Sequence, residues 1–134
     1  MTADLRTKSY ASEAVLYMAL ELSNKSWRLA FGDGTRQRQV CIAAGDLVAL
    51  CTEIDRAKRK FGLAAGVAVV SCYEAGRDGF WLHRQLEELG ISNRVVDAAS
   101  IEVSRRARRA KTDRLDAQAL LEKLIRYERG ERRV

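Results

Sequence analysis

Four acidic residues of this chain stand where carboxylates could hold a metal ion together. Glu21 and Glu74 each end an apolar run of strand length, and Asp113 and Asp116 stand at the beginning of the last predicted helix. Ligands of open α/β sheets collect outside the carboxyl ends of the strands. Carboxylate clusters hold Mg²⁺ or Mn²⁺, and two such ions about 3.5–4 Å apart can activate a nucleophile in phosphodiester chemistry. The four acids therefore predict a catalytic divalent-metal site.

Each of these acids also has a purely structural interpretation. Taken singly, Glu21 and Glu74 are solvated residues where a strand meets a loop. At about 100° per residue, Asp113 and Asp116 bracket the apolar stripe of the last helix, which places both carboxylates on its inward face. A buried carboxylate is costly unless it is paired or bound to a cation. Two acids three residues apart at a helix start also resemble a capping box.

A run of cations directly precedes the last predicted helix. It consists of Arg105, Arg106, Arg108, Arg109 and Lys111. Such runs are commonly a solvated helix face. Beside the acids, this run favours contacts to phosphate groups, because cations there would offset substrate repulsion and hold a nucleic-acid backbone near the metal.

Aromatic residues, the single histidine and the cysteines carry weaker signals. Trp27, Tyr73 and Trp81 could stack on bases, but aromatic residues at such positions more often fill a core. No nucleophile motif stands near His83, so a surface or packing role is expected for it. The three cysteines form no C-x-x-C pair and are interpreted as small buried hydrophobes.

Hydrophobic periodicity predicts the elements that must position these residues. Continuous apolar runs indicate strands covered on both faces, and apolar residues at helical spacing indicate helices. The predicted strands are residues 15–20, 26–31, 35–42, 67–73 and 93–96, and the predicted helices are residues 47–61, 77–89, 100–108 and 113–129. Asp46 is expected to cap the first helix, and Gly62 and Gly90 are expected to end the first two.

The order of these elements predicts the fold class. The first three strands form an antiparallel meander, and the crossover units that follow add parallel strands. We expect an α/β fold, a mixed sheet with helices on both faces. No linker or repeat interrupts the chain, so one domain is expected over residues 14–129, between a polar leader (1–13) and a tail (130–134).

Composition limits the class of protein. The 134 residues are 47% hydrophobic, enough for one compact core. The formal net charge of +6 favours an anionic partner such as a nucleic acid or a membrane surface, without choosing between them. The apolar runs are far shorter than the roughly 20 residues of a spanning helix, and no signal segment is evident. A soluble cytoplasmic protein is expected.

Two stretches carry a resemblance to a known family. They are K-T-D-R-L-D-A at residues 111–117 and Y-E-A-G at residues 73–76. Together with the arginine run, they resemble the N-terminal domain of the DEDD transposases of insertion sequences, over residues 15–124. The resemblance implies a RuvC-like, RNase H-like fold and metal-dependent cleavage and transfer of DNA strands in transposition and recombination. It also implies a structured guide RNA as a second partner, and it matches Glu74, Asp113 and Asp116 to the family's second, third and fourth acids.

Two features depart from the family pattern. The first acid is normally Asp, and that position falls on Glu21, whose additional methylene changes the geometry of a magnesium site. Family members are also longer and carry a second domain with a serine thought to attack DNA, which this sequence does not match. We therefore expect a catalytic-domain fragment, whose exposed apolar stripe on the last helix forms a homodimer.

Three functions are weighed from these observations. The leading one is a metal-dependent transposase domain. The second is a catalytically silent module of the same fold, which binds guide RNA or DNA and uses the carboxylates structurally. The third is a nucleotide-handling domain of the actin-like ATPase type, which has a related sheet order but is disfavoured by the absence of a Gly-rich phosphate loop.

Overall fold

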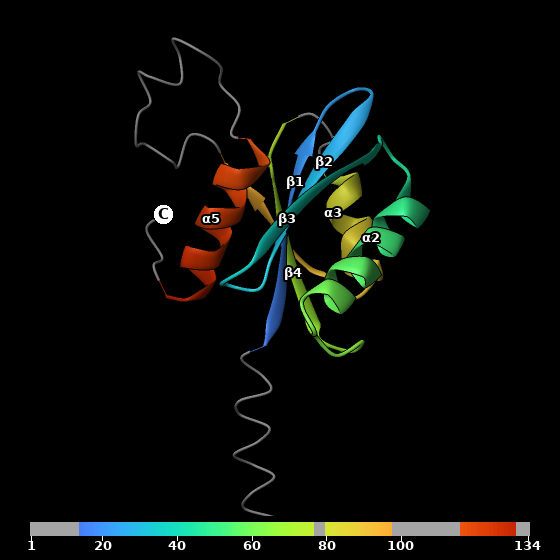
Figure 1. Ribbon diagram of the computed structural model, residues 1–134. Coiled ribbons are helices and arrows are strands. Elements are labelled where there is room, and N and C mark those ends of the chain that lie inside the picture. Colours follow the sequence, from blue (N-terminus) through green and yellow to red (C-terminus); the bar gives the residue numbers. More distant parts are fainter. Residues whose placement is uncertain (1–13, 77–79, 98–115, 131–134) are drawn as a thin grey trace, which may run out of the picture.

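Figure 1 shows a computed structural model of the chain, in which residues 14–76, 80–97 and 116–130 are described. Over these residues the predicted order of strands and helices is confirmed. The elements are β1 Val15–Leu22, β2 Ser26–Gly32, β3 Gln37–Ala43, α2 Leu47–Lys60, β4 Ala68–Glu74, α3 Trp81–Glu88, β5 Ser92–Val96 and α5 Ala117–Glu128. The predicted leader (1–13) and basic helix (100–108) lie outside the described residues. Within the described ranges, no helix is both long and apolar enough to cross a membrane.

The five strands form one mixed sheet in the order β3-β2-β1-β4-β5. β1 pairs antiparallel with β2, and β2 pairs antiparallel with β3. β4 pairs in parallel with both β1 and β5. The predicted α/β class and the combination of an antiparallel meander with parallel strands are therefore confirmed, and β1 occupies the centre of the sheet.

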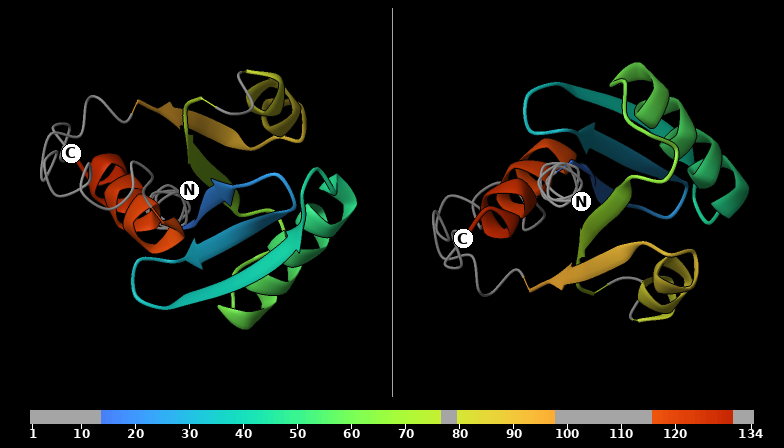
Figure 2. Two further views of the ribbon diagram at one scale, coloured as in Figure 1. Left: turned by 90° about the horizontal axis from the view of Figure 1, so that it is seen from above. Right: turned by 90° about the horizontal axis from the view of Figure 1, so that it is seen from below.

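Helices cover both faces of this sheet, as predicted (Figure 2). α2 and α3 pack against Leu16, Met18 and Leu20, and α5 packs on the other face against Tyr17 and Ala19. These residues alternate along β1, which is why its apolar run has no polar interruption. The apolar residues of α5 that are buried are Ala117, Leu120, Leu121 and Leu124. The prediction that this stripe is exposed is therefore wrong, and the basis for a homodimer through it is lost.

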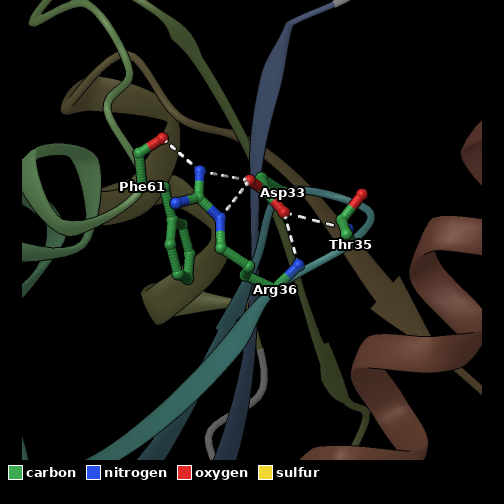
Figure 3. Close-up of polar contacts among 4 residues, drawn as sticks. All are labelled: Asp33, Thr35, Arg36 and Phe61. Atoms are coloured by element: carbon green, nitrogen blue, oxygen red, sulfur yellow. Dashed lines mark hydrogen bonds and ion pairs between the residues drawn. The ribbon is translucent and has the colours of Figure 1, made fainter.

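The turn between β2 and β3 is tied to the end of α2 (Figure 3). The Asp33 carboxylate accepts hydrogen bonds from the backbone N–H groups of Thr35 (2.9 Å) and Arg36 (2.7 Å). The Arg36 guanidinium donates to Asp33 Oδ2 and to the Phe61 carbonyl, and lies 5.2 Å from the centre of the Phe61 ring. Burial by itself would raise the pKa of Asp33, but the hydrogen bonds and the charge of Arg36 hold that pKa below its ordinary value.

Helix ends follow the predicted signals, with one exception. Asp46 caps α2 and accepts a hydrogen bond of 3.0 Å from its first turn, as predicted. Gly62 and Gly90 follow α2 and α3 with φ of +70° and +87°, a conformation that glycine adopts without strain. The helix predicted from residue 77 begins only at Trp81, with Phe80 as its N-cap, and residues 77–79 lie outside the described part of the chain.

The cysteines differ in their surroundings. Cys72 is buried beneath α5, and this burial, to which the charge of Glu128 adds, raises the pKa of its thiol to about 12. Cys41 is exposed, so the prediction that all three cysteines are buried is wrong. The reason is that β3 is an edge strand, and every second residue of it, Cys41 included, is exposed on the side of α5.

Candidate acidic site at the carboxyl edge of the sheet

Glu21 and Glu74 lie at the same edge and on the same face of the sheet. β1 and β4 are parallel neighbours, and Leu20 lies opposite Tyr73. Glu21 and Glu74 are the next residues of the two strands, and both are half-buried. Because side chains alternate along a strand, both carboxylates are on the face that α5 covers. We call this end of the sheet, where β1, β4 and β5 finish, the carboxyl edge.

The N-terminus of α5 lies at the carboxyl edge (Figure 1). Glu21 Oε1 accepts a hydrogen bond of 3.1 Å from the backbone N–H of Ala117, the first residue of α5. Asp116 accepts a hydrogen bond of 2.8 Å from the backbone N–H of Ala119. The first N–H groups of a helix have no partner within the helix, so the two carboxylates satisfy two of them and face the positive end of the helix dipole. Glu21 and Asp116 are thereby brought together.

The structure corrects the helical phase that the sequence predicts for Asp116. This residue has an extended backbone, with φ −78° and ψ 171°, and it is exposed. It is the N-cap of α5, so the alternative interpretation as a capping residue is confirmed at this position. Asp113 lies outside the described residues. Because α5 begins only at Ala117, the predicted inward-facing phase does not hold for Asp116.

The predicted ligands suit a hard cation in chemistry, but the described ones do not by themselves form a site. All four are carboxylates, the oxygen ligands that Mg²⁺ and Mn²⁺ prefer. Among residues 14–76, 80–97 and 116–130, no group of three or more Asp, Glu, His or Cys side chains lies close enough together to hold an ion. A site at this edge would therefore need at least one ligand from beyond these ranges, such as Asp113.

Two further charged residues at the carboxyl edge were not singled out from the sequence. Asp97 directly follows β5, where Val96 lies opposite Glu74. The sequence signal for Asp97 is the one that singled out Glu21 and Glu74, an acidic residue at the end of an apolar segment. Arg28 lies opposite Glu21 in the antiparallel register of β1 and β2, so its side chain is on the α5 face as well. This pairing depends on the strand register and has no local signal.

The residues predicted to contact nucleic acid divide into three groups. The basic run, Arg105, Arg106, Arg108, Arg109 and Lys111, lies outside the described residues. Trp27 and Tyr73 are buried, which confirms the expectation that they fill the core. Trp81 is 39% exposed, so it differs from the other two aromatic residues.

Comparison with known proteins gives one informative match. No family model matches the chain. A curated protein of Sinorhizobium fredii (strain NBRC 101917 / NGR234), named "Putative transposase y4rJ", is 41% identical over an alignment of 124 residues that covers 89% of this chain. The chain spans 31% of the length of that relative.

Proposed function

We propose that this chain is the sheet domain of a transposase and that it acts on DNA. The similarity to a protein named as a transposase, over most of this chain, supports the proposal. The net charge of +6 suits a polyanionic partner. We further propose that the mixed sheet is RNase H-like and of the RuvC type. From the family resemblance of residues 73–76 and 111–117 we also propose a guide RNA as a second partner, and from the similarity to a transposase we propose the cytoplasm as the location.

The proposed catalytic role is metal-dependent cleavage and transfer of DNA strands. The observation that carries it is the placement of Glu21 and Glu74 on adjacent parallel strands, at one edge and on one face, with the N-terminus of α5 hydrogen-bonded to Glu21. Glu21, Glu74, Asp113 and Asp116 would hold Mg²⁺ or Mn²⁺, which when bound would activate the attacking oxygen and stabilise the leaving one. The basic run at 105–111 would hold the DNA backbone against these acids.

A second function is favoured by a different observation. Glu21 and Asp116 both accept hydrogen bonds from the first turn of α5, so each has a structural role that needs no metal. The domain would then bind nucleic acid without catalysing a reaction. The two functions differ in whether a divalent ion stabilises the folded chain.

The metal proposal predicts that Mn²⁺ stabilises the wild-type chain and does so much less in Glu74→Gln. A ligand at 100 times its dissociation constant adds about 2.7 kcal/mol to the free energy of unfolding. We expect at least half of the gain to be lost in Glu74→Gln. Glu74 is the informative position, because removing Glu21 or Asp116 would also remove a cap of α5. Thermal unfolding with increasing Mn²⁺ measures the effect.

The control for this experiment is Glu88→Gln, the same chemical change at an exposed residue at the end of α3. It should keep the full effect of Mn²⁺. Equal stabilisation of wild type and Glu74→Gln, or no stabilisation of the wild type, would reject the metal site and leave the binding function.

Both functions predict that the basic run contacts phosphate groups. Replacing Arg105, Arg106, Arg108 and Arg109 by Ala should weaken binding of duplex DNA. The negative slope of log K against log salt should become shallower by about 0.9 per lost contact, about 3.6 in all. Fluorescence anisotropy at several salt concentrations measures the slope. As a control, Arg56, Arg59 and Lys60 of α2 are replaced by Ala. The control removes three charges and the variant four, so an equal change per removed charge would show that only net charge matters, and the local contact would be rejected.

A further inference from the structure

Two large aromatic side chains are exposed side by side in sequence at the beginning of α3. Phe80 is 63% exposed and Trp81 is 39% exposed. Phe80 is also the N-cap of α3, a position where Ser, Thr, Asp or Asn would accept a hydrogen bond from the helix and a phenyl ring cannot. The chain thus places an apolar ring in water at a position where a polar residue would stabilise the helix. This arrangement indicates a role outside the packing of the domain.

The pair lies at the carboxyl edge. The Trp81 ring packs against Trp27, with 6.5 Å between ring centres and an angle of 40° between planes. Trp27 is paired with Leu22, the residue after Glu21. Figure 1 shows the start of α3 at the same end of the sheet as the turn between β1 and β2.

A second contact links the start of α3 to β4. The backbone N–H of His83 donates a hydrogen bond of 3.1 Å to the Tyr73 hydroxyl, and Tyr73 directly precedes Glu74. The α3 segment that carries the aromatic pair is therefore held to β2, through Trp27, and to β4, the strand that ends at Glu74. The position of this α3 segment relative to the two strands depends on the buried side chains of Trp27 and Tyr73.

The rings are held in place by other rings. Trp81 is supported by Trp27, which is only 2% exposed, and Phe80 is 6.4 Å from His83 in an edge-to-face arrangement of 85°. Side chains that are ordered before binding lose little conformational entropy on binding. Such rings can stack on nucleobases, and this stacking is tolerant of base identity because every base has a flat face.

Positive charges flank the pair. Arg84 is exposed and lies one helical turn after Phe80 and Trp81, on the same side of α3. Lys25 is exposed in the turn between β1 and β2, two residues before Trp27. A nucleic-acid strand could stack its bases on the two rings while its phosphates contact Arg84 and Lys25. An apolar protein partner would leave these two cations without partners. The overall charge of +6 agrees with an anionic occupant.

We propose that Phe80 and Trp81 form a stacking platform for unpaired bases of the DNA substrate. The platform rests on the proposed action on DNA, and it adds that the domain takes unpaired rather than only duplex DNA at this edge. It does not depend on bound metal. Binding measured in EDTA therefore separates it from the metal site.

The test compares Phe80→Ala with wild type, using fluorescence anisotropy of a labelled single-stranded DNA and of a duplex of the same sequence, both in EDTA. We expect single-strand binding to weaken about tenfold, within the range of one lost stacking contact, and duplex binding to change less than about twofold. Phe80→Tyr should restore single-strand binding, because it restores the ring. Leu89→Ala, an exposed apolar residue just beyond the other end of α3, should bind like wild type.

Several results would overturn the platform. These are no single-strand binding by the wild type, an unchanged affinity in Phe80→Ala, or equal losses for single strand and duplex. Tighter binding of single-stranded RNA than of DNA would overturn DNA as the occupant. Self-association of the wild type that Phe80→Ala abolishes would assign the pair to a second copy of the chain. Urea unfolding of each variant checks that the fold is kept. Should Phe80→Ala unfold, Trp81→Leu removes the other ring of the pair and should cause the same selective loss of single-strand binding.

Discussion

Replacing Leu120 by Ala is expected to lower the free energy of unfolding by about 2–5 kcal/mol. Leu120 is 1% exposed and lies in the core between α5 and the sheet, with Tyr17, Ala19 and Cys72. The cost combines the lost burial of its methyl groups with the cavity that they leave. Ala is a good helix former, so helix propensity adds nothing to the loss. Urea unfolding measures it as a lower midpoint with an unchanged slope.

Glu122→Ala is the matched control, since Glu122 is exposed on the same helix. It should change the free energy of unfolding by no more than about 0.5 kcal/mol. A loss below about 1 kcal/mol in Leu120→Ala would show that α5 does not pack on the sheet as described. The position matters for the candidate site as well, because this packing brings Asp116 to the carboxyl edge.

The second large effect is expected at Asn93, a polar residue buried between β5 and α3. Asn93 Oδ1 accepts a hydrogen bond of 2.7 Å from the Ser71 hydroxyl, and Asn93 Nδ2 lies 2.9 Å from His83 Nδ1. Ser71 is fully buried and Asn93 is 5% exposed. Asn93→Ala would remove the acceptor of the Ser71 hydroxyl, and a buried polar group without its partner costs about 1–3 kcal/mol. We expect a loss of that size in urea unfolding.

A double-mutant cycle identifies the source of this loss. Removing both partners costs less than the sum of the single losses, so Ser71→Ala/Asn93→Ala should show a coupling of about 0.5–3 kcal/mol. Ser92→Ala, at the exposed neighbouring position in β5, should be close to neutral. Strictly additive losses would mean that the hydroxyl and the amide do not interact, and that the loss at Asn93 comes from its side-chain contact with His83.

Several features of this protein were readable from local sequence. The strands and helices of the described residues occur in the predicted order, because burial on one or both faces leaves a periodic trace in a short segment. Asp46 as a cap and Gly62 and Gly90 as helix ends follow from the chemistry of single residues. The positions of Glu21 and Glu74 after apolar strands were equally local. These features need no information from distant parts of the chain.

Other features depended on contacts between distant segments. Asp116 caps α5 instead of facing inward, and the amide beside it bonds to Glu21, 96 residues earlier in the chain. The stripe on α5 is buried because α5 docks on the sheet, and Cys41 is exposed because β3 became an edge. Hydrophobic periodicity thus determined which elements form. Only the packing of those elements decided which carboxylates meet and which rings stay exposed, because these outcomes depend on partners that no local pattern contains.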